Sequence, residues 1–90
     1  MAFASPVSPC APSFEEQAVH QRVACNVRLL RADRLLSLTQ AAALAGIHWR
    51  HWQKIEGAQV NLTLQTLVRV ARAMSVDVAE LFGDPLKRLN

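Results

Sequence analysis

Residues 37–56, S-L-T-Q-A-A-A-L-A-G-I-H-W-R-H-W-Q-K-I-E, decide the predicted fold, because they place two helix starts around one glycine turn. Ser37 and Gln40 have the spacing of a capping box, which begins a helix by satisfying its free backbone N–H groups. Gly46 can take the positive φ that a sharp turn needs, and the small Ala42 suits a close approach of two helices. The stretch predicts a helix, a tight turn and a second helix.

The second of these helices is marked by its apolar spacing. With His48 as N-cap, Ile47 and Trp52 occupy the N′ and N4 positions of a hydrophobic staple, and Ile55 continues the inward edge. The side chains left outside are Trp49, Arg50, Gln53 and Lys54. Such an outward face is what a DNA-reading helix presents to the major groove.

The outward residues differ in what they can recognise. Arg50 is the best candidate for specificity, because a guanidinium can bond guanine O6 and N7 together. Lys54 suits a base edge or a phosphate equally, and Gln53 can reach adenine. Trp49 leaves three roles open, namely contact with a thymine methyl group, stacking on Arg50, or contact with another protein.

The N-terminal third of the chain predicts a tail and one long helix. Residues 1–12 are rich in Pro, Ser and Ala without a period, and we expect them to be disordered, which leaves residues 13–90 as the domain. A capping box at Ser13 begins a helix that runs to about Arg34. This helix is longer than a first helix needs to be, so its early part suits a separate arm or a contact surface.

Two further helices follow the helix pair. Thr63 is the candidate start of one, and Asp77 with Glu80 caps a short closing helix that Gly83 and Pro85 end. The apolar residues at helical spacing in these and the first helix are Val19, Val23, Val27, Leu30, Leu64, Leu67, Val68, Ala71, Met74, Val78, Leu81 and Phe82. The chain shows no strand alternation, so the prediction is an all-α fold of five helices.

The formal net charge of +3 is unevenly distributed. Six basic residues lie between positions 17 and 54 against Asp33 alone, which favours an anionic partner for this segment. Cys10 and Cys25 do not make a disulfide framework, and His48 and His51 have no third ligand beside them. We therefore expect no metal and no other cofactor.

Several classes of protein are excluded by missing features. The chain has neither a signal peptide nor a run of about 20 apolar residues, so we expect a cytoplasmic protein without a membrane partner. It has no glycine-rich phosphate loop, no nucleophile with a suitably spaced base and no paired acids, so we expect that it is not an enzyme.

From residue 23 to residue 82 the chain resembles the Cro and lambda-repressor-like (Xre) helix-turn-helix family. The residues that carry the resemblance are Asn26, Val27, Arg28, Leu30, Arg31, Arg34, Ser37, Ala42, Gly46, Ile47, Ile55, Glu56, Asn61, Leu62, Thr63, Leu64, Thr66, Leu67, Ala71, Leu81 and Phe82. The resemblance implies a five-helix DNA-binding domain whose helices 2 and 3 form the helix-turn-helix. It also implies a structural ion pair between Arg31 and Glu56.

The resemblance further implies two sets of DNA contacts. Base edges would be met by Trp49, Arg50 and Lys54, with Gln53 added from its outward position, and phosphates by Ser37, Gln40, His48, Gln59, Asn61 and Thr63. Leu35 and Ser75 stand where the family commonly has glycine at helix ends, and left-handed geometry there costs a non-glycine residue roughly 1 kcal/mol or more.

The sequence thus predicts a transcriptional regulator that binds double-stranded DNA as a homodimer on a palindromic operator, without a small-molecule effector. The expected dimer contact is formed by Leu81, Phe82, Leu86 and Leu89 of the closing segment, with residues 14–20 as the second candidate. Phage repressors, restriction-modification controllers and antitoxins all remain open. The alternative is a protein-interaction module that keeps the fold but binds DNA weakly or not at all, through an apolar patch of Leu38, Leu44 and Trp49.

Overall fold

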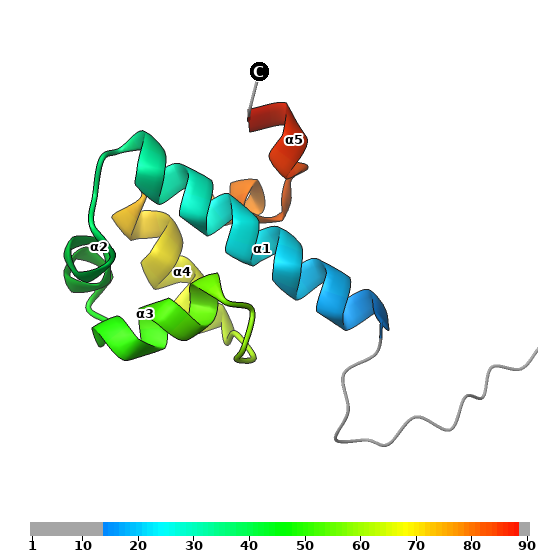
Figure 1. Ribbon diagram of the computed structural model, residues 1–90, viewed down its shortest axis with the longest axis horizontal. Coiled ribbons are helices and arrows are strands. Elements are labelled where there is room, and N and C mark those ends of the chain that lie inside the picture. Colours follow the sequence, from blue (N-terminus) through cyan, green and yellow to red (C-terminus); the bar gives the residue numbers. More distant parts are fainter. Residues whose placement is uncertain (1–13, 89–90) are drawn as a thin grey trace, which may run out of the picture.

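A computed structural model of the chain describes residues 14–88, and within them it is all-helical (Figure 1). The elements are α1 (Phe14–Asp33), α2 (Leu38–Ala45), α3 (Trp49–Glu56), α4 (Leu64–Ala73), the 3-10 helix η1 (Val78–Phe82) and α5 (Pro85–Arg88). The all-α prediction is confirmed. The predicted disordered tail, the Ser13 cap, Cys10 and Leu89 lie outside the described residues. None of the helices within 14–88 is long and apolar enough to cross a membrane.

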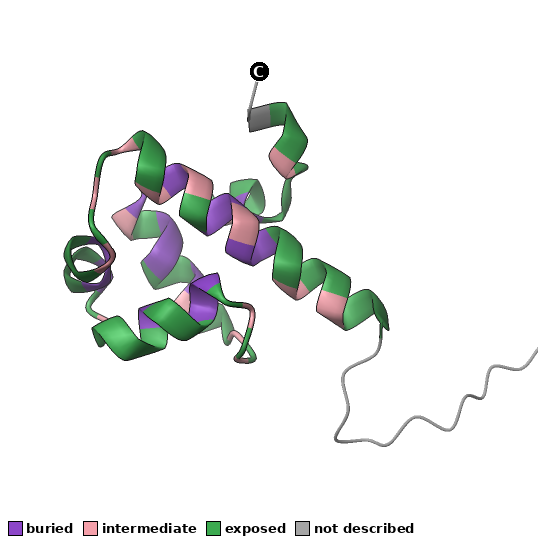
Figure 2. Cartoon of the chain, viewed as in Figure 1, coloured by how far each residue is buried: buried purple, intermediate pink, exposed green. Residues whose placement is uncertain are grey.

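α1 is the base on which the other helices are assembled (Figure 1). It contacts α3, η1 and α5, while α2 packs on α3 and α4. Its buried side chains begin only at Val23. The turns before that residue are exposed or partly exposed (Figure 2), and they extend past the rest of the domain (Figure 1). The early part of α1 is therefore an arm that contributes no side chain to the buried core.

The core is formed by one face from each of the longer helices. Its fully buried members include Trp52 of α3, Met74 after α4, and Leu81 of η1. The apolar stripe of α4 differs from the predicted one, since Leu64 and Val68 are 79% and 43% exposed. The buried side chains of this segment are Leu67, Val70, Ala71 and Met74. The i, i+3, i+4, i+7 pattern is present, but it starts one turn later than the sequence suggested.

Helix caps are formed where the sequence predicts them. The Ser37 hydroxyl accepts from the Gln40 backbone N–H at 3.1 Å, and the Gln40 side chain accepts from the Ser37 N–H at 2.8 Å. Gly46 has φ 70°, and His48 and Thr63 are the N-caps of α3 and α4. These local bonds fix the boundaries of the helix-turn-helix.

Within residues 14–88, three non-glycine residues adopt left-handed backbone geometry in turns between helices. Leu35 and Ser75 have φ values of 56° and 59°, at the two positions where the family commonly has glycine. Ala58, which sequence reasoning missed, also has φ 56°. Each stores a backbone cost that glycine would not incur.

The closing segment departs from the prediction in two ways. η1 ends at Phe82, before Gly83, as predicted, but Pro85 begins a further helix, α5, which suits a residue that lacks a backbone N–H at the first helical position. Leu81 is fully buried, so it does not belong to the surface left over for a dimer contact. Asn26 explains this burial, because its side-chain amide donates to the backbone oxygens of Leu81 at 2.8 Å and Gly83 at 2.9 Å and holds η1 against α1.

Candidate nucleic-acid interface

The outward face of α3 has the side chains that the sequence predicts there. All four candidates are exposed, namely Trp49, Arg50, Gln53 and Lys54. Together with Gly57 and Gln59 they line an open hollow of about 480 Å³. The lining of this hollow contains two cations and no acid, so its charge is complementary to that of an anionic ligand.

The opposite side of α3 is anchored in the core. Trp52, Ile55 and Glu56 are buried, and Ile47, at the staple position before the helix, packs against the same cluster. Helical geometry then leaves the intervening side chains in solvent. The apolar edge of α3 therefore determines which residues can reach a ligand.

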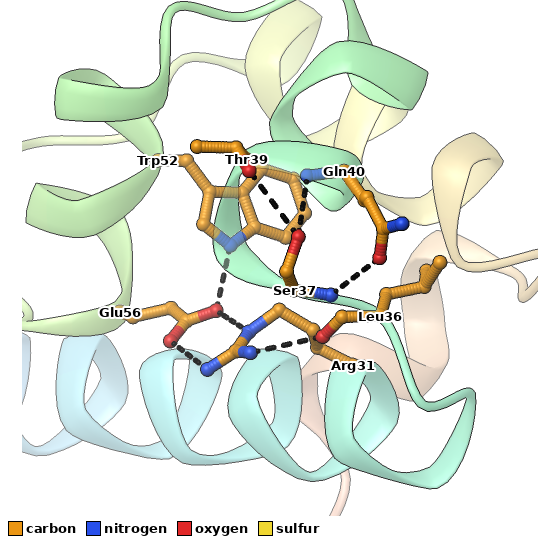
Figure 3. Close-up of polar contacts among 7 residues, drawn as sticks. All are labelled: Arg31, Leu36, Ser37, Thr39, Gln40, Trp52 and Glu56. Atoms are coloured by element: carbon orange, nitrogen blue, oxygen red, sulfur yellow. Dashed lines mark hydrogen bonds and ion pairs between the residues drawn. The ribbon is translucent and has the colours of Figure 1, made fainter.

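Glu56 is the centre of a polar cluster that joins α1 to α3 (Figure 3). Arg31 of α1 grips its carboxylate with two N–H groups, Nε at 2.6 Å from Oε2 and Nη2 at 3.0 Å from Oε1. The Trp52 indole N–H donates to the same Oε2 at 2.6 Å, and Arg31 Nη1 donates to the Leu36 backbone oxygen at 3.0 Å. The hydrogen bond to Glu56 raises the pKa of Arg31, against the opposing effect of burial.

This cluster contains more than the resemblance implies. The Arg31–Glu56 pair comes with two partners that were not foreseen, the indole of Trp52 and the carbonyl of Leu36. The signal for Trp52 was present in the sequence, because it lies four residues before Glu56 and so shares its helix face. The cluster fixes the angle of α3 on α1, and through it the orientation of the exposed face.

The start of α3 carries a stack of three consecutive side chains. The Arg50 guanidinium carbon lies 5.3 Å from the centroid of the Trp49 ring. The His48 ring is stacked on the same indole, with 5.7 Å between centroids and 27° between planes. His48 Nδ1 also accepts from the Arg50 backbone N–H at 3.1 Å, which ties the histidine ring to the helix start.

The candidate phosphate contacts lie at three helix starts and in one loop. Ser37 and Gln40 cap α2, His48 caps α3 and Thr63 caps α4, whose first turn it closes by accepting from the Thr66 N–H at 3.1 Å. Gln59 and Asn61 belong to the loop between α3 and α4, and all six candidates are exposed. Gln59 alone of these six lines the α3 hollow. Exposed helix starts favour phosphate because their free N–H groups and dipoles point outward.

The apolar surface outside the core is scattered. In the closing segment Phe82 is 39% and Leu86 69% exposed, while on the arm of α1 Phe14 is 88% and Val19 45% exposed. The apolar patch of Leu38, Leu44 and Trp49 was expected for a protein-interaction module. Leu38 does not belong to this surface patch, because it packs against the core.

Comparisons with known proteins agree on the kind of fold. No family model matches the chain. Control protein C.SmaI from Serratia marcescens is 33% identical over 63 residues, which cover 70% of this chain and 75% of that protein. The crystal structure of the restriction-modification controller protein C.AhdI from Aeromonas hydrophila matches with a TM-score of 0.70 and 28% identity, over 72% of this chain and 98% of that one. The hypothetical transcription factor NHTF from Neisseria shares the fold with a TM-score of 0.75 at 24% identity, over 94% of each chain.

Proposed function

The chain belongs to the Cro and lambda-repressor-like (Xre) helix-turn-helix family, and on that premise we propose that it regulates transcription by binding a palindromic operator in double-stranded DNA. Proteins of this family act as DNA-binding regulators, and the chain is accordingly not an enzyme. We propose further that α3 lies in the major groove and that two copies of the chain bind one operator.

The observation that carries the proposal is the exposed face of α3. Arg50 and Lys54 share one hollow with the uncharged donors Gln53 and Gln59. A helix with such a face meets base edges through its first turn and the flanking phosphates through its neighbours. In this chain the exposed N-terminal ends of α2 and α4 would meet the flanking phosphates.

Each residue of the face has a role in the proposed complex. Arg50 bonds guanine O6 and N7, and Gln53 is placed one turn further along for adenine. Lys54 meets a base edge or a phosphate. Ser37 and Thr63 offer their helix starts to the DNA backbone, which positions α3 without reading sequence.

A dimer is proposed because one recognition helix reads too few base pairs to find a genomic site. Two copies related by a dyad would place their α3 helices roughly 34 Å apart, one turn of DNA. Phe82 and Leu86 are the exposed apolar residues of the closing segment and support a contact there. The arm of α1, with Phe14 and Val19, is the second candidate surface.

The similarity to C.SmaI and C.AhdI favours one class among those that the sequence leaves open. We propose that the chain is a controller protein of a restriction-modification system. The operator should then lie in front of the genes of such a system, which mapping of the bound sites in the genome would test.

The decisive experiment selects bound sequences from a random duplex pool and then titrates binding with salt. We expect a dyad-symmetric sequence and an affinity that falls steeply with salt, because each neutralised phosphate releases a counterion. Absence of any enriched sequence, together with salt-independent binding to random DNA, would leave the protein-interaction module as the function.

A single variant tests the assignment of Arg50. Arg50→Ala should weaken operator binding by about 1–3 kcal/mol and relax the preference at one base pair. Arg28→Ala, which removes the same charge from the exposed side of α1, is the matched control and should affect all sequences alike. Equal losses on the operator and on random DNA for Arg50→Ala would remove it from base reading.

A further inference from the structure

We propose that Trp49 and Arg50 together read a two-base step, a 5-methylated pyrimidine followed by guanine. This inference rests on the proposed function and goes beyond it, because it names the base step and gives Trp49 a role in specificity. The chemical group recognised would be the C5 methyl group, which thymine and 5-methylcytosine share.

Trp49 and Arg50 are held together in the stack at the start of α3. The Arg50 guanidinium carbon lies 5.3 Å from the Trp49 ring centroid, and the His48 ring is stacked on that indole at 5.7 Å. The hydrogen bond from the Arg50 backbone N–H to His48 Nδ1 fixes the histidine ring, which is the third side chain of the stack. The guanidinium and the indole are therefore held side by side before any DNA is bound, which lowers the entropy that binding must cost.

Trp49, unlike Trp52, is not part of the hydrophobic core. Trp52, three residues later, is fully buried and fills the core. Trp49 remains 42% exposed and lines the α3 hollow beside Arg50, Gln53 and Lys54. A large apolar ring at the mouth of a charged hollow has uncovered surface that an apolar group of the ligand can cover.

The major groove of DNA presents groups that match both side chains. Guanine presents its N7 and O6 acceptors there, and a neighbouring thymine presents its C5 methyl group. Successive bases on one strand are about 3.4 Å apart, so an indole centred 5.3 Å from a guanidinium on guanine can reach the adjacent base. The methyl group of that adjacent pyrimidine would then contact the indole, and the proposal places the pyrimidine on the 5′ side of the guanine.

The first test leaves the protein unchanged and alters the DNA. The probe is the operator selected from the random pool, in which each thymine that precedes a guanine is replaced in turn by deoxyuridine. We expect one such replacement in each half-site to weaken binding about fourfold. This is the factor expected when the burial of one methyl group is lost. A second arm replaces the same thymine by cytosine or 5-methylcytosine, and the methylated base should bind more tightly than the unmethylated one by a similar factor.

The second test removes the indole. Trp49→Ala should abolish the difference between the thymine and deoxyuridine probes, whereas Trp49→Phe should keep part of it. Leu64→Ala, at an apolar residue 79% exposed on α4, is the matched control and should leave the difference intact. In Trp49→Phe the only tryptophan is the buried Trp52, so loss of the DNA-induced change in tryptophan fluorescence would place Trp49 at the interface.

The outcomes separate this inference from the proposed function. A selected operator whose thymine and deoxyuridine forms bind equally would overturn the base-step inference and leave the regulator proposal standing. The same holds if Trp49→Ala binds the operator with an undiminished methyl preference. Failure to select any sequence would overturn both.

Discussion

Replacing Glu56 by alanine should destabilise the fold more than replacement of any exposed acid. Its carboxylate is 8% exposed and accepts from Arg31 Nε, Arg31 Nη2 and Trp52 Nε1. Glu56→Ala removes all three bonds at once. It leaves the indole N–H of a fully buried Trp52 without an acceptor and the Arg31 guanidinium without its anion.

The magnitude follows from the burial of the two partners. An unsatisfied buried N–H costs about 1–3 kcal/mol, and breaking a buried ion pair costs about 3–5 kcal/mol. The Arg31 side chain keeps 24% of its surface in solvent, so water can replace part of the lost interaction. We therefore expect a loss of about 3 kcal/mol in the free energy of unfolding. In a domain of this size such a loss lowers the melting temperature by more than about 12 °C.

Thermal and urea unfolding followed by circular dichroism at 222 nm would measure this loss. Asp33→Ala is the matched control, because this acid is 83% exposed and its 3.9 Å ion pair with Arg34 lies at the surface, so the change should stay within about 0.5 kcal/mol. Since the pKa of Arg31 is raised, its contribution persists at every pH below the strongly alkaline range. The difference in the free energy of unfolding between wild type and Glu56→Ala should therefore show no change from titration of Arg31 between about pH 6 and pH 9.

The double variant Arg31→Met with Glu56→Leu provides the sharper test of the reasoning. Replacing both members of a buried pair by apolar residues is often neutral, so the double variant should be more stable than Glu56→Ala alone. If Glu56→Ala melts at the same temperature as the wild type, the claim that this pair holds α1 to α3 is refuted. A double variant that loses the sum of both single losses would refute the claim that the two residues are coupled.

Three further predictions concern other parts of the fold. Asn26→Ala should lose about 1–3 kcal/mol in urea unfolding, because the backbone oxygens of Leu81 and Gly83 lose their donor, and Asn26→Asp should not restore it. Leu35→Gly should raise the free energy of unfolding by up to about 1 kcal/mol, since φ is 56° there and the side chain is 90% exposed; an unchanged or lower stability would contradict this account of the turn. Phe82→Glu should convert a dimer to a monomer in sedimentation at tens of micromolar, and a dimer that persists would direct attention to the arm of α1.

Local patterns were predictable because they depend on neighbours in the sequence. The capping box of Ser37 and Gln40, the left-handed Gly46 and the N-caps His48 and Thr63 are all formed within a few residues. The exposed face of α3 followed from the same local logic, since the staple decides which edge is buried.

Long-range contacts were not predictable in this way. The burial of Leu81 depends on an amide 55 residues earlier, Asn26, which periodicity does not reveal. The exposure of Leu64 and Val68 depends on how α4 meets α2 and η1, because an apolar residue at the right spacing still needs a partner helix beside it. Sequence reasoning therefore identified the longer helices and the exposed face of α3 but misplaced part of the surface.

Two sets of long-range polar contacts tie other parts of the fold to α1, and they would give α1 an indirect role in the proposed DNA complex. Asn26 holds η1, and Arg31, little more than one turn further along the same helix, holds α3. The closing segment and α3 are thus both held by side chains of α1. If the closing segment forms the dimer contact, the separation of two α3 helices on DNA is set through α1. Asn26→Ala, which frees the closing segment from α1, should then weaken binding to DNA with two half-sites more than it weakens binding to DNA with a single half-site.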